Sequence, residues 1–124
     1  MIRVFLVEDD EQMREALSRM LAGLGSVDLV GHAEREDLAV TWLLSNRDGW
    51  DLSIIDLMLA EGSGLRVLSS CRVRANHQRM VVLSNHVTKK SARHCLDLGA
   101  DATFDKVSGL EDLFAYCQAM ARSP

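Results

Sequence analysis

Five polar side chains stand where apolar, strand-like segments of the sequence end. They are Glu8, Asp9, Asp56, Ser84 and Lys106. In an open, doubly wound sheet, binding sites form outside the carboxyl ends of the parallel strands. We therefore expect three carboxylates, one hydroxyl and one ammonium group to meet at a single edge of the molecule.

Three carboxylates held close together repel one another, and a hard divalent cation relieves that repulsion. Mg²⁺ prefers oxygen ligands and also binds phosphate oxygens, so an acidic cluster of this kind suits phosphoryl transfer. A carboxylate can act as the nucleophile and form an acyl phosphate. Asp56 is the candidate, because a carboxylate at the end of the largely apolar run 52–55 needs a partner or a use. Lys106 would offset charge on the transferring group, and Ser84 would hydrogen-bond a phosphoryl oxygen.

Each of these residues also has an ordinary structural explanation when it is considered alone. Ser84 is then a strand-end hydroxyl, and Lys106 is a surface cation. The neighbouring Asp10 is expected to cap a helix rather than to join the acidic cluster. The prediction of a site therefore rests on the combination of residues and on their order along the chain.

Strand-like segments alternate with segments of helical periodicity along the whole chain. The predicted strands are 2–7, 27–33, 52–56, 80–84 and 102–104. Apolar residues at helical spacing predict a helix after each strand, and Thr88 and the pair Ser108 and Glu111 match helix N-terminal caps. Five consecutive strand–helix units predict an α/β fold in which helices cover both faces of a parallel sheet.

Composition limits the classes of protein that fit this chain. It has 124 residues, 48% of them apolar, and a net charge of −4, which suits one domain of ordinary size. No apolar run approaches the roughly 20 residues of a membrane span, and the first residues lack the pattern of a signal peptide. We therefore expect a cytoplasmic protein. Cys71, Cys95 and Cys117 are far apart and show no metal-binding or redox spacing.

Charge is unevenly distributed, since residues 62–96 contain basic but no acidic side chains. Such a stretch is either an ordinary solvated face or a docking surface for an acidic partner. If it is a docking surface, we place its centre at Lys89, Lys90 and Arg93. Direct binding of nucleic acid is not expected, because the overall charge is acidic and few aromatic residues accompany the basic ones.

Four motifs span most of the chain. They are FLVEDD at 5–10, IIDLMLAEGSG at 54–64, VVLSNH at 81–86 and GADATFDK at 99–106. Together they resemble the response-regulator receiver domains of two-component signalling, chemotaxis regulators among them. The resemblance implies a flavodoxin-like (βα)5 fold with a doubly wound five-stranded sheet of strand order 2-1-3-4-5. It also implies a single receiver domain at 1–122, followed by a short tail at 123–124.

The resemblance implies a role for each matching residue. The implied metal ligands are Glu8, Asp9, Asp56 and the main-chain carbonyl of Met58. Asp9 would bind Mg²⁺ directly, whereas Glu8 would act mostly through water. Asp56 is the implied phosphoacceptor, Lys106 would reach the phosphoryl group, and Ser84 would be the hydroxyl of the conformational switch.

The resemblance also implies partners. A sensor histidine kinase or a phosphotransfer protein would donate the phosphoryl group, and a downstream protein or a further effector domain would receive the signal. A homodimer is a further arrangement that we leave open. The domain would catalyse only its own phosphorylation and dephosphorylation, and would not be an enzyme acting on other molecules.

The sequence departs from the family pattern at three positions. Ala60 stands where many members have proline, and Val107 follows Lys106 where many have a proline with a cis bond. A cis bond before a residue other than proline costs about 3–4 kcal/mol, so we expect a trans bond here. Thr103 replaces the usual aromatic switch residue, and Phe104 should point to the opposite face of its strand. The switch is therefore expected to be read out differently.

Two positions near the acceptor are expected to set the lifetime of the phosphate, namely Met58 and His86. Met58 offers no hydrogen bond to an attacking water, which predicts slow hydrolysis. The main alternative is a pseudo-receiver, a protein-interaction module that acts without phosphorylation. An aspartate-nucleophile phosphohydrolase is a weaker alternative, because such enzymes use a second aspartate at the position that Met58 occupies.

Overall fold

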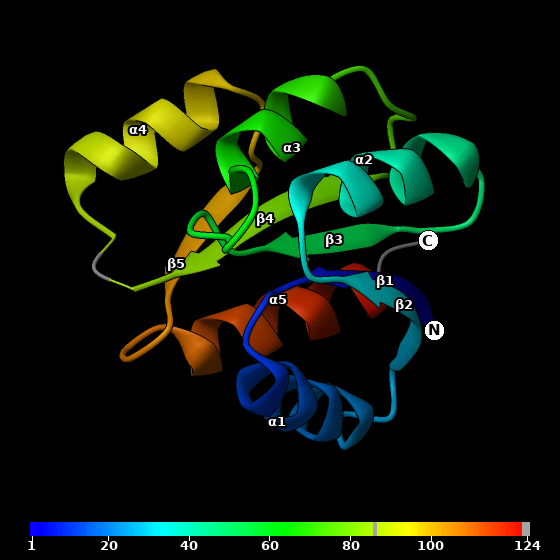
Figure 1. Cartoon of the computed structure of the whole chain (residues 1–124). Coiled ribbons are helices and arrows are strands. Elements are labelled where there is room, and N and C mark those ends of the chain that lie inside the picture. The colour runs from blue at the N-terminus through cyan, green and yellow to red at the C-terminus, as the bar shows by residue number, and fades with distance from the viewer. Residues whose placement is uncertain (86, 123–124) are drawn as a thin grey trace.

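The strands and helices alternate along the whole chain in the computed structural model, which describes residues 1–85 and 87–122. In order they are β1 (Ile2–Val7), α1 (Glu11–Ala22), β2 (Val27–Ala33), α2 (Glu36–Ser45), β3 (Leu52–Ile55), α3 (Gly64–Ser70), β4 (Arg79–Ser84), α4 (Lys89–Asp97), β5 (Ala102–Asp105) and α5 (Leu110–Arg122). The five strands pair in parallel in the order β2-β1-β3-β4-β5. Helices α1 and α5 cover one face of the sheet, and α2, α3 and α4 cover the other (Figure 1). The predicted fold and strand order are confirmed.

The central strands are apolar because both of their faces are buried, as is usual in parallel sheets. Alternate side chains of β1 enter two separate cores: Val4 and Leu6 join the cluster beneath α1 and α5, whereas Phe5 and Val7 join the cluster beneath α2, α3 and α4. This alternation aligns the strands, since a slip of one residue would exchange the two sets. The strand register in turn determines which of the residues that follow the strands lie next to one another at each edge of the sheet.

The three cysteines lie within these cores, and all three are buried and unpaired. Burial raises the pKa of each thiol above its ordinary value, and it raises the pKa of Cys117 to about 11. Thiols of this kind remain protonated and behave as small apolar side chains. None of the helices in the described part of the chain combines the length and the apolar character that a membrane span requires.

Capping residues determine where the helices near the predicted site begin. The Oδ1 atom of Asp10 accepts hydrogen bonds from the N–H groups of Gln12 and Met13, at 2.9 and 3.2 Å. Asp10 is therefore the N-cap of α1, as expected, and the link between β1 and α1 is only three residues long. Thr88 caps α4, also as expected, and forms a reciprocal capping box with Ser91.

The predicted capping box of Ser108 and Glu111 is wrong, because α5 begins only at Leu110. Gly109 stands before the helix instead, and its main-chain N–H donates to the carbonyl oxygen of Asp105 at 2.7 Å. A Cβ atom at residue 109 would lie 2.8 Å from the main-chain nitrogen of Asp105. The chain turns too tightly here for any residue but glycine, and this moves the start of the helix past Ser108.

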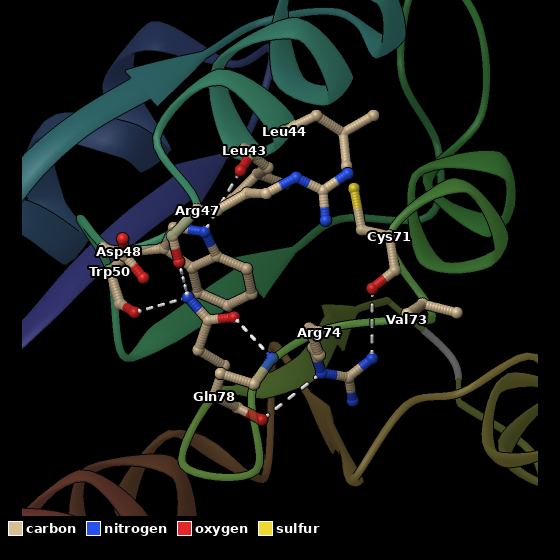
Figure 2. Close-up of a pocket in the computed structure, with 10 residues that line it drawn as sticks. Leu43, Leu44, Arg47, Asp48, Trp50, Cys71, Val73, Arg74 and Gln78 are labelled. Atoms are coloured by element: carbon tan, nitrogen blue, oxygen red, sulfur yellow. Dashed lines mark hydrogen bonds between the residues drawn. The ribbon is translucent and has the colours of Figure 1, made fainter.

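A network of side chains closes the opposite edge of the sheet, where β3 and β4 begin (Figure 2). The amide nitrogen of the buried Gln78 donates to the carbonyl oxygens of Arg47 and Trp50, at 2.6 and 2.9 Å, and Gln78 Oε1 accepts from the N–H of Ala75. The guanidinium of Arg74 donates to Asp101 at 2.8 Å. Gln78, Arg74, Ala75, Arg47 and Trp50 are among the residues that line a pocket of about 240 Å³. Because Gln78 and Arg74 bond to groups of the chain itself, we interpret the network as structural.

Candidate functional site

The polar residues predicted from the strand ends meet at the carboxyl edge of the sheet. Pairing of Val7 with Ile55 brings Glu8 and Asp56 to the same level, and pairing of Ser84 with Asp105 brings Ser84 beside Lys106. Glu8, Asp56 and Ser84 are 3%, 7% and 4% exposed, respectively. The cluster is thus largely withdrawn from water, and its charges need partners within the protein.

Lys106 is the cation that partners the two buried carboxylates. Its Nζ atom lies 2.6 Å from Glu8 Oε1 and 2.8 Å from Asp56 Oδ2. Burial lowers the pKa of Lys106, but the hydrogen bonds to Asp56 and Glu8 outweigh this effect and leave its pKa above the ordinary value. The lysine is therefore a fixed positive charge at neutral pH.

Glu8 is held in a less favourable environment than its lysine partner. Burial raises the pKa of Glu8 above its ordinary value, the hydrogen bond from Lys106 opposes the rise, and the charge of Asp56 adds to it. Three ionised carboxylates and one ammonium would leave an excess of negative charge in this corner. A further cation would relieve that excess.

The oxygen atoms of the acidic residues are spaced for such a cation. Glu8, Asp9 and Asp56 each place one carboxylate oxygen within 4.8 Å of the others. Two oxygens bound to one Mg²⁺ at about 2.1 Å can be at most about 4.2 Å apart. The cluster therefore fits Mg²⁺ if side chains adjust slightly or if one carboxylate binds through a water molecule. Hard oxygen donors are also the ligands that this ion prefers.

Both carboxylate oxygens of Asp56 accept hydrogen bonds from neighbouring groups. Asp56 Oδ1 accepts from the hydroxyl of Ser84 at 3.1 Å and from the N–H of Met58 at 3.2 Å, and Oδ2 accepts from Lys106. Its main chain packs against Gly64, where any Cβ atom would collide with the carbonyl oxygen of Asp56. The first residue of α3 must therefore be glycine.

Met58, two residues after Asp56, is largely in solvent, with 78% of the residue exposed. The residue also forms an isolated antiparallel bridge with Ser63 across the β3–α3 loop. The role of its carbonyl group as a metal ligand stays a prediction. His86, the second residue assigned to phosphate lifetime, lies outside the described residues.

Strand β5 carries Thr103, one of the three positions at which the chain departs from the family pattern. Thr103 pairs with Val82 of β4, while Phe104 packs on the opposite face, edge to face with the ring of Tyr116 at 5.7 Å between centroids. Phe104 therefore cannot take the place of an aromatic residue at 103. No cis peptide bond occurs between described residues, so the expected trans bond between Lys106 and Val107 is confirmed.

Sequence reasoning missed Asp105, which joins the loop after β4 to the loop that begins at Lys106. Its Oδ1 atom accepts from the N–H groups of Val107 and Ser108, at 2.8 and 3.3 Å, and its Oδ2 atom accepts from the N–H of Val87 at 3.3 Å. Asp105 thus ties the β4–α4 loop to the β5–α5 loop. Aspartate at a strand end often bonds the main chain two residues later, and this was the available signal.

The basic residues of α4 are exposed, as a docking surface requires. Lys89, Lys90 and Arg93 all reach solvent. Arg93 lies 3.7 Å from Asp97, one turn further along the helix, so its charge is partly balanced. Helix α4 lies beside α3 on the outer face of the molecule (Figure 1). This exposed position suits an ordinary solvated face and also a docking surface for an acidic partner.

Comparison with known proteins identifies the family. Residues 4–118 match the family model of the response regulator receiver domain. The chain belongs to this family. It is thus a receiver domain of a response regulator, the class of protein that acts in two-component signalling.

Relatives and solved structures agree with this assignment. The receiver domain is 31% identical, over 98% of its length, to the swarming motility regulation protein RssB of Serratia marcescens and 30% identical, again over 98%, to the response regulator MprA of Mycobacterium ulcerans. It covers 53% and 50% of those proteins, so it spans about half of their length. The response regulator domain of Thermotoga maritima CheB has the same fold, with a TM-score of 0.83, 24% identity and coverage of 100% of this chain and 99% of that one.

The central position of Lys106 predicts a large effect of its removal. Replacement by methionine, Lys106→Met, leaves Glu8 and Asp56 buried without a cation, and removing one partner of a buried ion pair typically costs about 3–5 kcal/mol. We expect a loss of that size in the free energy of unfolding at pH 7, measured by urea denaturation. The matched control Lys90→Met, on the exposed surface of α4, should unfold like the wild type.

The pH dependence of this deficit follows from the carboxylates. The hydrogen bond from Lys106 lowers the pKa of Glu8, so in Lys106→Met the pKa of Glu8 in the folded protein lies further above its value in the unfolded chain. The loss of stability in Lys106→Met is therefore complete above the folded-state pKa of Glu8. It disappears as the pH falls towards the pKa of Glu8 in the unfolded chain. A variant as stable as the wild type at pH 7, or a deficit that grows as the pH falls, would contradict this account.

Proposed function

We propose that this receiver domain is a switch that accepts a phosphoryl group on Asp56 in the presence of Mg²⁺. The observation that carries the proposal is the convergence of Glu8, Asp9, Ser84 and Lys106 on one buried carboxylate. An acidic cluster of this composition has the donor set for Mg²⁺ and a nucleophile beside it.

In the proposed reaction, an oxygen of Asp56 attacks phosphorus while the bond between phosphorus and the donor's leaving group breaks. Lys106 and Ser84 already contact the two oxygens of Asp56, at 2.8 and 3.1 Å. Once the phosphoryl group is on Asp56, both groups are close enough to move onto its oxygens. The transfer therefore replaces hydrogen bonds within the cluster by hydrogen bonds to the new group, and a shift of Ser84 follows.

Mg²⁺ would be held by Glu8, Asp9 and Asp56, with the carbonyl group of Met58 as a further ligand. The bound ion supplies positive charge between the acidic residues and the phosphoryl oxygens. Lys106 remains the cation that holds Glu8 and Asp56 in place before the ion arrives. The domain promotes only its own phosphorylation and dephosphorylation.

We propose that the read-out does not use an aromatic side chain. A shift of Ser84 would act on Thr103 of β5 and on the β4–α4 loop, which Asp105 ties to the loop after β5 through the N–H of Val87. A sensor histidine kinase or a phosphotransfer protein in the cytoplasm would supply the phosphoryl group. A downstream protein, a second copy of the domain or a further effector domain would receive the signal.

The proposal is tested by the intact mass of the protein after incubation with acetyl phosphate, with and without Mg²⁺. We expect one phosphoryl adduct that requires Mg²⁺ and is lost in Asp56→Asn, which keeps the size of the side chain but removes the nucleophile. Asp10→Asn is the matched control, because Asp10 caps α1 and lies outside the acidic cluster. The absence of any adduct in the wild type would instead favour a pseudo-receiver that acts without phosphorylation.

Met58 should lengthen the life of the phosphorylated state. Its apolar side chain gives an attacking water no hydrogen bond, whereas Met58→Asn would offer one close to the acceptor. We expect the adduct to decay over minutes or longer in wild type and several-fold faster in Met58→Asn, followed by mass after removal of acetyl phosphate. Decay of the wild type within seconds in Mg²⁺ would show that Met58 does not protect the phosphate.

The basic residues of α4 provide a separate prediction about partners. We propose that they form a docking surface for an acidic partner, so reversing Lys89, Lys90 and Arg93 to glutamate should weaken partner capture. Phosphorylation by acetyl phosphate should remain unchanged, since these side chains are exposed on α4 and take no part in the acidic cluster. The comparison uses immobilised, phosphorylated protein and a lysate of the source organism. If the wild type and the charge-reversed variant capture the same partner in equal amounts, the basic stretch is an ordinary solvated face.

A further inference from the structure

One hydrogen bond joins the acidic cluster to the loop after β3. The main-chain N–H of Ala60 donates to Oδ2 of Asp9 at 2.7 Å, between residues 51 positions apart in the sequence. The bond is short and its acceptor is a carboxylate, which places it among the stronger hydrogen bonds in proteins. Ala60 itself is exposed, so its amide would otherwise bond to water.

Helix α2 anchors the loop immediately after Ala60. Glu36, the first residue of that helix, accepts from the N–H of Ser63 through Oε1 at 2.9 Å, and its own N–H donates to the carbonyl oxygen of Glu61 at 3.2 Å. Between these bonds, Gly62 has a φ of +87° and approaches Glu36 so closely that a Cβ atom would collide with it. The loop is therefore anchored immediately after Ala60.

From this geometry we infer that the Ala60 amide is a positioning group that orients Asp9 for Mg²⁺. The inference rests on the proposed function, because it requires the ion at the acidic cluster. A carboxylate has two oxygens and about four sites for hydrogen bonds or metal ions. The bond from Ala60 occupies Oδ2 and leaves Oδ1 of Asp9 available to the ion. Groups that hold a metal ligand in this way typically contribute about 10–100-fold to metal affinity.

Ala60 can donate this hydrogen bond because it is not a proline. Proline has no N–H group and could not hold Asp9. The side chain at this position takes no part in the bond and is exposed, so residues other than proline should serve equally well. Metal binding would also be linked to the anchoring of the loop on α2 through Glu36.

The test is a calorimetric titration of the unphosphorylated chain with Mg²⁺. Ala60→Pro should weaken Mg²⁺ binding about tenfold, which is the lower end of the effect expected for a group that hydrogen-bonds to a metal ligand. Ala60→Ser, which keeps the N–H group, should bind like the wild type and serves as the matched control. In an Asp9→Ala background, Ala60→Pro should have no further effect, because the amide no longer has a metal ligand to orient.

A second measurement avoids the risk that proline distorts the loop. Hydrogen exchange of the Ala60 amide in the wild type should be slow for an exposed residue, and it should stay slow when Mg²⁺ is added. Fast exchange, or a loss of protection in Mg²⁺, would overturn the inference, as would wild-type affinity in Ala60→Pro. These results leave the proposed function intact. A wild type that binds no Mg²⁺ would overturn both.

Discussion

The structure depends on a single lysine held between two buried carboxylates. Lys106 contacts Glu8 at 2.6 Å and Asp56 at 2.8 Å, and all three charges lie in a corner with little access to water. Such a group of charges is stable only when its members are held close together, since an unpaired buried charge is costly. The same closeness leaves an excess of negative charge that favours a divalent cation. The residues that balance one another's charge are therefore the same residues that the proposed phosphorylation would use.

The fold delivers these three charges to one point from the ends of three strands. Parallel pairing of β1, β3, β4 and β5 brings their carboxyl ends together, and two buried cores hold their register. The connections are kept short by Asp10, which caps α1, and by Gly64 and Gly109, where a Cβ atom would collide with the main chain. Gln78 and Arg74 hold the opposite edge of the sheet through hydrogen bonds to Trp50 and Asp101.

The sequence allowed much of this arrangement to be predicted, and the errors have physical causes. Apolar runs with polar ends located every strand to within one residue and predicted which polar side chains meet at the carboxyl edge of the sheet. The start of α5 was misplaced because Ser108 matches a capping pattern, whereas the close approach of Gly109 to Asp105 depends on tertiary structure. The bond between Asp105 and the N–H of Val87 and the bond of the Ala60 amide were missed for a similar reason. They join loops that are distant in sequence, and main-chain donors leave no mark in the residue type.

The most direct test of the central claim is a crystal structure of the protein with Mg²⁺ and beryllium fluoride, which stands in for the phosphoryl group. The account predicts a beryllium fluoride adduct on Asp56, in which a carboxylate oxygen binds beryllium. Lys106 Nζ and Ser84 Oγ should have moved onto fluorine atoms of the adduct, at hydrogen-bonding distances of about 2.7–3.0 Å. Glu8 and Asp9 should face a Mg²⁺ ion beside the adduct. A structure in which Asp56 carries no adduct, with Lys106 still bridging Glu8 and Asp56, would contradict the account.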